Sequence, residues 1–72
     1  MTKEEFLVQM QDVLQTDTNL TPDTVLVDLE EWDSLSIMAT MAFVNKNFGL
    51  TIKMSDFKEV ESMSDLMTKV GL

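Results

Sequence analysis

The chain has no cysteine and no histidine among its 72 residues. Without cysteine it can form no disulfide, no thiolate nucleophile and no cysteine-based zinc or iron–sulfur site. Without histidine it also lacks the usual base at neutral pH and the commonest metal ligand. A chain of this length allows one domain, residues 1–72, with a modest core. We therefore expect its stability to come from the packing of helices.

Basic side chains are scarce, with five lysines against 13 acidic residues and a formal net charge of −8. Such a charge disfavours phosphate backbones and anionic membrane surfaces, so we expect no nucleic acid partner. The longest mostly apolar stretch, residues 35–44, is too short to cross a bilayer, and residues 1–10 lack the pattern of a signal peptide. We expect a cytoplasmic monomer with no membrane insertion. Nine of the acids lie in residues 1–33 with a single lysine, whereas residues 34–72 carry four of each.

The first segment has the spacing of an amphipathic helix. Thr2 and Glu5 match a capping box, in which each side chain satisfies a backbone N–H of the other residue. We expect a helix from this cap to about Gln15. Its apolar residues recur at helical spacing on one face. They are Phe6, Leu7, Met10, Val13 and Leu14.

A long loop is predicted from Thr16 to Trp32. This segment contains Asn19 and the turn sequence Thr21-Pro22-Asp23, and it shows no sustained helical period. A loop of this length needs anchors on the core. We expect them to be Leu20, Val25, Leu26 and Leu29.

A second helix is predicted from Ser34 to about Phe48, with Asp33 as its N-cap and Gly49 just past its end. One stripe follows the helical period and consists of Leu35, Met38, Met41, Ala42 and Phe48. Ile37, Phe43 and Val44 lie off that stripe, so the helix is apolar nearly all round. Such a helix is either central in its bundle or presents part of its apolar surface to a partner.

Two further helices complete the predicted fold. Ser55 can cap a short helix from Asp56 to Val60, with Phe57 and Val60 inward. Ser62 opens a last helix through Val70, closed by Gly71. Its expected buried face is Met63, Leu66, Met67 and Val70. The prediction is an all-α fold: a small four-helix bundle with a long loop between helix 1 and helix 2 and a short third helix.

The residues offer little for catalysis. Protein catalysis needs a nucleophile beside a base, a carboxylate pair with separated pKa values, or a metal. Ser34 has only Asp33 as an obvious neighbour, and the chain has neither a glycine-rich phosphate loop nor a calcium-binding loop pattern. We expect that the protein is not an enzyme and holds no metal. Two interpretations of Ser34 stay open: the first residue of a capped helix, or an attachment point, since a helix N-terminus favours a phosphate ester.

The stretch Trp32-Asp33-Ser34-Leu35 resembles the modification motif of acyl carrier proteins and of the related peptidyl carrier domains. In these families the serine of an Asp-Ser-Leu motif carries 4'-phosphopantetheine. The resemblance covers nearly the whole chain: its length, acidity, lack of cysteine, long first loop, Phe48 at the end of the second helix, Ile52, short third helix and amphipathic last helix.

This resemblance implies that Ser34 is the attachment residue, whose hydroxyl attacks the pyrophosphate of coenzyme A in a phosphopantetheinyl transferase. Asp33 would help to position that enzyme, and Leu35 would be an exposed apolar contact. The implied function is an acyl carrier that holds acyl intermediates as thioesters on the arm and meets acyl-loading and acyl-transferring enzymes. An aminoacyl or peptidyl carrier is an alternative, and so is an unmodified helical interaction module.

The chain departs from fatty-acid carriers, which line the second helix with acids. Here that face is Ser36, Ala39, Asn45, Lys46 and Asn47, and the third helix carries Lys58. Trp32 stands where a small residue is common. These differences favour a carrier for a dedicated biosynthetic pathway, in which apolar contacts from Leu35, Ile37 and Met38 select the partner.

Two features allow both a structural and a functional interpretation. Met38, Met41, Met54 and Met63 either fill the core or line a space for an acyl chain, since methionine adapts to irregular shapes. Trp32 either packs the loop onto the bundle or covers the base of the arm.

Overall fold

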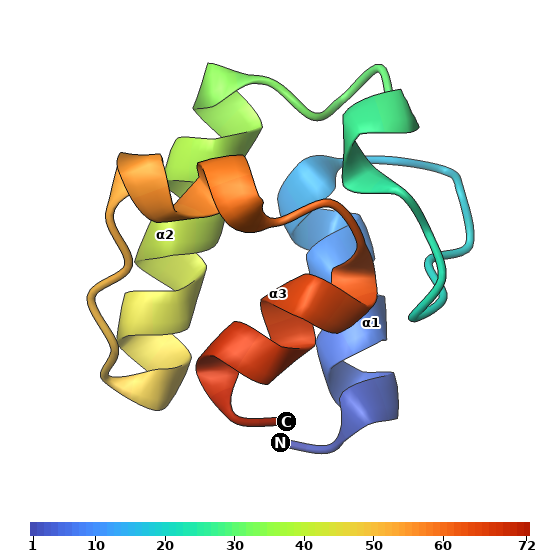
Figure 1. The fold of residues 1–72 in the computed structure, drawn as a ribbon. Coiled ribbons are helices and arrows are strands. Elements are labelled where there is room, and N and C mark those ends of the chain that lie inside the picture. Colours follow the sequence, from blue (N-terminus) through green and yellow to red (C-terminus); the bar gives the residue numbers. More distant parts are fainter.

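The computed structural model describes all residues from 1 to 72, and its regular elements are all helices, with no strand (Figure 1). Three α-helices and two 3-10 helices follow one another along the chain. In order they are α1 (Lys3–Leu14), η1 (Leu26–Asp28), α2 (Ser34–Phe48), η2 (Met54–Glu59) and α3 (Met63–Val70). The all-α bundle with a long first loop is therefore confirmed, with η2 in the place of the short third helix.

The ends of α1 lie close to where the sequence predicts them. The Thr2 hydroxyl accepts from the Glu5 N–H, and the Glu5 carboxylate accepts from the Thr2 N–H at 2.9 Å. The hydrogen bond from the Thr2 backbone to this carboxylate lowers the pKa of Glu5. The helix ends at Leu14, and its C-cap Gln15 adopts the left-handed conformation with φ 53°. Three residues of the expected face are buried, namely Phe6, Met10 and Leu14, while Leu7 and Val13 are half-buried against the core.

Rings from α1 and α2 hold these two helices together. Phe6 is fully buried and lies 5.9 Å from both Phe43 and Phe48, measured between ring centroids. These tilted contacts are the arrangement that aromatic pairs prefer. Packing against α1 thus fixes the middle and the end of α2.

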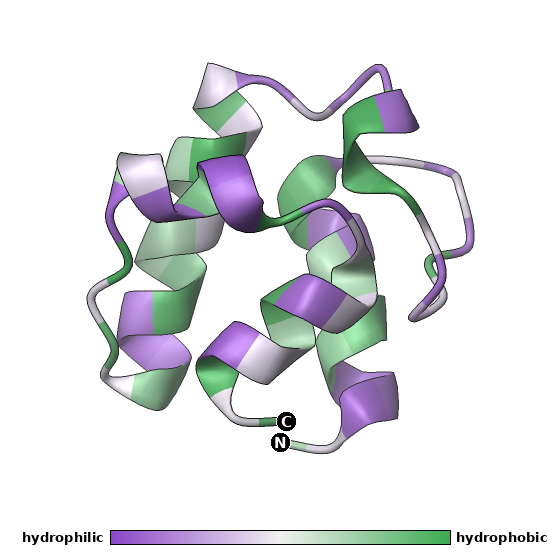
Figure 2. Cartoon of the chain, in the orientation of Figure 1, coloured by the Kyte–Doolittle hydropathy of each residue, from purple (hydrophilic) through white to green (hydrophobic).

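The buried face of α2 differs from the predicted stripe. Its buried positions are Ser36, Thr40 and Val44, which are four residues apart. Leu35 is instead 77% exposed and Met38 57% exposed. Ser36 and Thr40 can be buried because each hydroxyl donates to a backbone oxygen of the helix start: Ser36 Oγ to Asp33 O at 3.0 Å, and Thr40 Oγ1 to Ser36 O at 2.8 Å. Figure 2 shows that hydrophobic residues cover most of α2, with strongly hydrophilic residues only in its last turns.

The long loop is tied to the start of α3 by backbone hydrogen bonds. The Leu26 N–H donates to Glu61 O at 2.8 Å, and the Met63 N–H donates to Thr24 O at 2.9 Å. Leu20 and Leu26 are buried and Leu29 is half-buried, so these three anchors are confirmed. Val25 is not an anchor of the core, because its side chain is 41% exposed. It contributes backbone instead, in an isolated antiparallel bridge with Ser62.

The last two elements close the core. The 3-10 helix η2 begins two residues earlier than the predicted helix, because Asp56 accepts from the Lys53 N–H at 3.0 Å and Ser55 caps nothing. Phe57 and Val60 are buried as expected. The limits of α3 match the prediction, and all four residues of its expected face are buried. Backbone N–H groups of Glu61 and Ser62 donate to the Asp65 carboxylate and lower its pKa. None of the helices has the length and apolar character needed to cross a membrane.

Candidate functional site

The start of α2 is held by a closed ring of local hydrogen bonds. Asp33 Oδ1 accepts from the Ser36 N–H at 2.9 Å, and the Asp33 N–H donates to Ser36 Oγ at the same distance. The Asp33 carbonyl accepts from the Ile37 N–H at 2.9 Å. Because Ser36 is buried, this capping box fixes the helix start against the body of the protein.

Ser34 lies in the first turn of α2, between the cap and Leu35, and its side chain is exposed. Its hydroxyl takes part in no hydrogen bond, unlike that of Ser36. The backbone N–H groups of Ser34 and Leu35 also have no partner, because the cap satisfies only the Ser36 N–H. A free hydroxyl thus stands at a helix N-terminus beside two free N–H donors, a setting that favours an attached phosphate group.

The family model described as "Phosphopantetheine attachment site" matches residues 4–70. The chain belongs to the phosphopantetheine-binding carrier family. Searches of curated proteins and of solved structures returned no match. The cofactor of this family is 4'-phosphopantetheine, bound covalently, and members of the family act as carriers that meet a phosphopantetheinyl transferase and partner enzymes.

The start of α2 fits this group. A carrier of the family needs an accessible oxygen nucleophile with space for a phosphodiester. The exposed Ser34 hydroxyl meets the first requirement, and the two free N–H groups can donate to phosphate oxygens. The phosphopantetheine arm supplies a terminal thiol, which a chain without cysteine otherwise lacks.

The residues predicted to contact partner enzymes differ in the solvent exposure of their side chains. Leu35 and Met38 project outward beside Ser34, and Asp33 is exposed. Ile37 is half-buried and packs against the core, which leaves less of its surface for a partner. Of the face on which related carriers bear acids, Ser36 is buried, whereas Ala39 and residues 45–47 are exposed. The exposed surface next to Ser34 is therefore apolar on the side of α2 and acidic on the side of the loop.

Trp32 connects the end of the loop to η2. Its ring is half-buried and lies 6.0 Å from that of Phe57 between centroids, with the planes inclined by 51°. Of the two interpretations of Trp32, the structure supports packing of the loop onto the bundle. This contact joins the segment that leads into Asp33 and Ser34 to η2.

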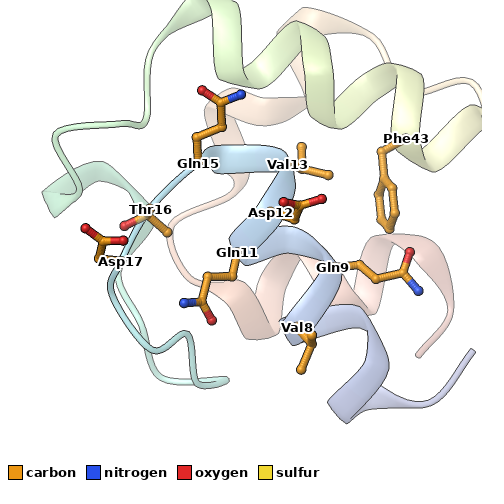
Figure 3. A pocket seen from close by; sticks show the side chains of 9 residues that line it. All are labelled: Val8, Gln9, Gln11, Asp12, Val13, Gln15, Thr16, Asp17 and Phe43. Carbon is orange, nitrogen blue, oxygen red and sulfur yellow. The ribbon is translucent and has the colours of Figure 1, made fainter.

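The four methionines do not line a common space. Met63 is fully buried, Met41 is half-buried, and Met38 and Met54 are exposed. The two surface hollows of the structure contain none of them. A hollow of about 370 Å³ lies beside the cap, between the end of α1 and the start of α2. A larger one, of about 740 Å³, follows α1 toward Phe43 (Figure 3). Sequence reasoning missed both hollows, because they form only when the two helices pack together.

Proposed function

We propose that Ser34 is the phosphopantetheine attachment residue and that the protein carries acyl intermediates as thioesters for a dedicated biosynthetic pathway. The observation that supports this proposal is the free, exposed Ser34 hydroxyl at the start of α2, in a chain of the phosphopantetheine-binding family. No other serine combines an Asp-Ser-Leu setting with a free helix N-terminus. Ser36 and Ser62 are engaged in caps. Ser55 and Ser64 each follow a methionine, in η2 and in the first turn of α3.

The modification is a phosphoryl transfer to Ser34. Its Oγ forms a bond to the phosphorus that bears the pantetheine, and the bond from this phosphorus to the rest of the coenzyme A pyrophosphate breaks. Adenosine 3',5'-bisphosphate leaves, and the hydroxyl proton passes to the transferase. The chain itself contributes the nucleophilic oxygen and the rigid helix start that presents it. Its free N–H groups lie where they can bind the new phosphodiester.

The surface around Ser34 supports partner selection by apolar contact. The only charged residue of α2 is Lys46, in its last turn, so no acidic stripe runs along this helix. Leu35 and Met38 provide apolar area next to the attachment point. Partner enzymes with an apolar recess at the entrance of their active site fit this surface better than enzymes that rely on a basic ridge.

The test is the intact mass of the protein after incubation with coenzyme A and a promiscuous phosphopantetheinyl transferase. We expect the native chain to gain one phosphopantetheine and Ser34→Ala to gain none. Ser64→Ala is the matched control, because Ser64 is also an exposed serine in the first turn of a helix. We expect Ser64→Ala to behave as the native chain.

A folded native chain that gains no mass would overturn the proposal. The exposed side chains of Leu35 and Met38 would then favour an unmodified interaction module. If the mass gain occurs, loading the thiol with a panel of acyl and aminoacyl adenylate-forming enzymes distinguishes the proposed acyl carrier from the aminoacyl or peptidyl alternative.

A further inference from the structure

The two surface hollows adjoin each other at the end of α1. Val13 and Gln15 line both of them. On α2, Leu35, Ser36 and Ala39 line the smaller hollow and Phe43 lines the larger one. Leu35, Ala39 and Phe43 are spaced by four residues and lie on one face of the helix. We call the surface formed by Val13, Gln15, Leu35, Ala39 and Phe43 the α1–α2 groove.

The groove begins next to Ser34. Asp33 and Leu35, its two sequence neighbours, both line the smaller hollow. From Leu35 to Phe43 the helix rises by about 12 Å, at 1.5 Å per residue. At the far end the Phe43 side chain points from α2 toward α1, with Gln9 beside it (Figure 3). A flexible chain attached at Ser34 can thus follow this face of α2 across both hollows.

The lining matches the chemistry of a pantetheine arm. The arm is uncharged beyond its phosphate and carries geminal methyl groups, a hydroxyl and two amides. Val13, Leu35 and Ala39 offer apolar contact for the methyl groups. The side-chain amide of Gln15 can donate to and accept from the amides of the arm, and the carboxylate of Glu31 can accept their N–H groups.

The charges around the groove agree with this orientation. Carboxylates in both hollows repel a phosphate, namely Glu31 and Asp33 in the smaller one and Asp12 and Asp17 in the larger one, whereas the start of α2 attracts it. The phosphodiester therefore stays at the helix start, and only the neutral part of the arm enters. No hollow opens on the opposite side of α2, where this helix packs against η2.

We propose that the α1–α2 groove holds the phosphopantetheine arm of this chain, with its thiol end near Phe43. The inference rests on the proposed attachment at Ser34 and adds where the arm rests between visits to partner enzymes. It also assigns Gln15 and Ala39 to arm binding, two residues that sequence reasoning did not consider for this purpose.

The test compares backbone amide NMR shifts of the unmodified and the modified protein. Intact mass first confirms that phosphopantetheine is attached. We expect shift changes at Gln15, Ala39 and Phe43, in addition to those beside Ser34, and none at Met54 and Phe57 on the η2 side. Ala39→Gln places a neutral, helix-compatible side chain in the groove. Ala42→Gln is the matched control, because Ala42 is an exposed alanine of the same helix outside both hollows.

We expect Ala39→Gln to lose the shift change at Phe43 and Ala42→Gln to retain it. Unmodified spectra of both variants show whether each is folded like the native chain. Changes confined to residues beside Ser34, changes at Met54 and Phe57, or equal behaviour of the two variants would each overturn the groove as the resting place. A missing mass gain would instead overturn the attachment at Ser34, before any spectrum is compared.

Discussion

The second and third α-helices begin alike and bury different residues. Each has a polar N-cap whose side chain accepts from the backbone N–H three residues later. In α3 the buried residues are all apolar, and they form one clean helical face. In α2 the buried line contains Ser36 and Thr40, while Leu35 and Met38 are exposed.

This difference shows that hydrophobicity alone does not set the orientation of a helix. The hydroxyls of Ser36 and Thr40 donate to backbone oxygens of the same helix, so their burial leaves no polar group unsatisfied. The apolar residues that α2 does not need for its core are then free to face solvent beside Ser34. In α3 the apolar face supports the fold, and in α2 part of the apolar surface is available for contact with other molecules.

The largest expected effect comes from replacing one leucine of each helix by alanine and comparing the losses of stability. Leu66 is fully buried in α3, and Leu66→Ala should lower the free energy of unfolding by about 2–5 kcal/mol, through lost burial and a cavity. Leu35→Ala should change it by less than about 0.5 kcal/mol, because the side chain is exposed. Urea unfolding followed by circular dichroism measures both. Equal losses would show that Leu35 supports the fold after all.

A smaller effect is expected at the junction between the loop and α2. Trp32→Leu keeps apolar bulk but removes the ring contact with Phe57, which should cost about 1 kcal/mol. Trp32→Phe keeps an aromatic ring and serves as the control. The thermal unfolding midpoint of each variant gives the comparison. If the leucine variant is as stable as the phenylalanine variant, the contact between the two rings does not stabilise the loop.

Two variants of Asp33, the N-cap of α2, separate its structural role from a role in recognition by the transferase. Asp33→Ala removes the acceptor for the Ser36 N–H and should cost about 1 kcal/mol. Asp33→Asn keeps an acceptor oxygen and should leave stability nearly unchanged. The initial rate of modification by the transferase is the second measurement. If the rate falls with Asp33→Asn while stability stays native, the transferase recognises the negative charge of Asp33. If the rate falls only with Asp33→Ala, the transferase needs the ordered start of α2.

The smallest expected effect concerns the cap of α3 and depends on pH. The folded state lowers the pKa of Asp65, because backbone N–H groups of Glu61 and Ser62 donate to its carboxylate. Its contribution is therefore present above roughly pH 4, the ordinary value for aspartate, and is lost as the pH falls through the lowered pKa. Melting temperatures of the native chain and of Asp65→Asn should differ most near neutrality and converge in acid. A difference independent of pH would contradict this explanation.

Much of the fold follows from local signals in the sequence. The Thr2–Glu5 spacing and Gly71 mark helix ends that the structure confirms, because caps depend on residues close in sequence. The face of α3 is also predicted, since its apolar residues form a single stripe. Asp33 and Ser34 lie where the sequence places them, at the cap and in the first turn of α2.

The remaining features depend on contacts between distant segments. Phe43 and Phe48 of α2 pack on Phe6, and only Phe48 belongs to the apolar stripe that the sequence indicates. Val25 pairs through its backbone with Ser62, which no side-chain pattern indicates. The groove likewise needs α1 and α2 to be placed against each other before it exists.

At Gln15 the backbone conformation favours glycine, whereas the position of the side chain favours glutamine. It ends α1 in the left-handed region at φ 53°, where residues other than glycine are strained by about 1–2 kcal/mol. A glycine there would relieve the backbone, yet it would also remove the amide side chain that borders both hollows. At this residue, the change to glycine that would raise thermal stability would also remove a contact with a bound arm. A search for more stable versions of this carrier would select glycine here and loosen the hold on its arm.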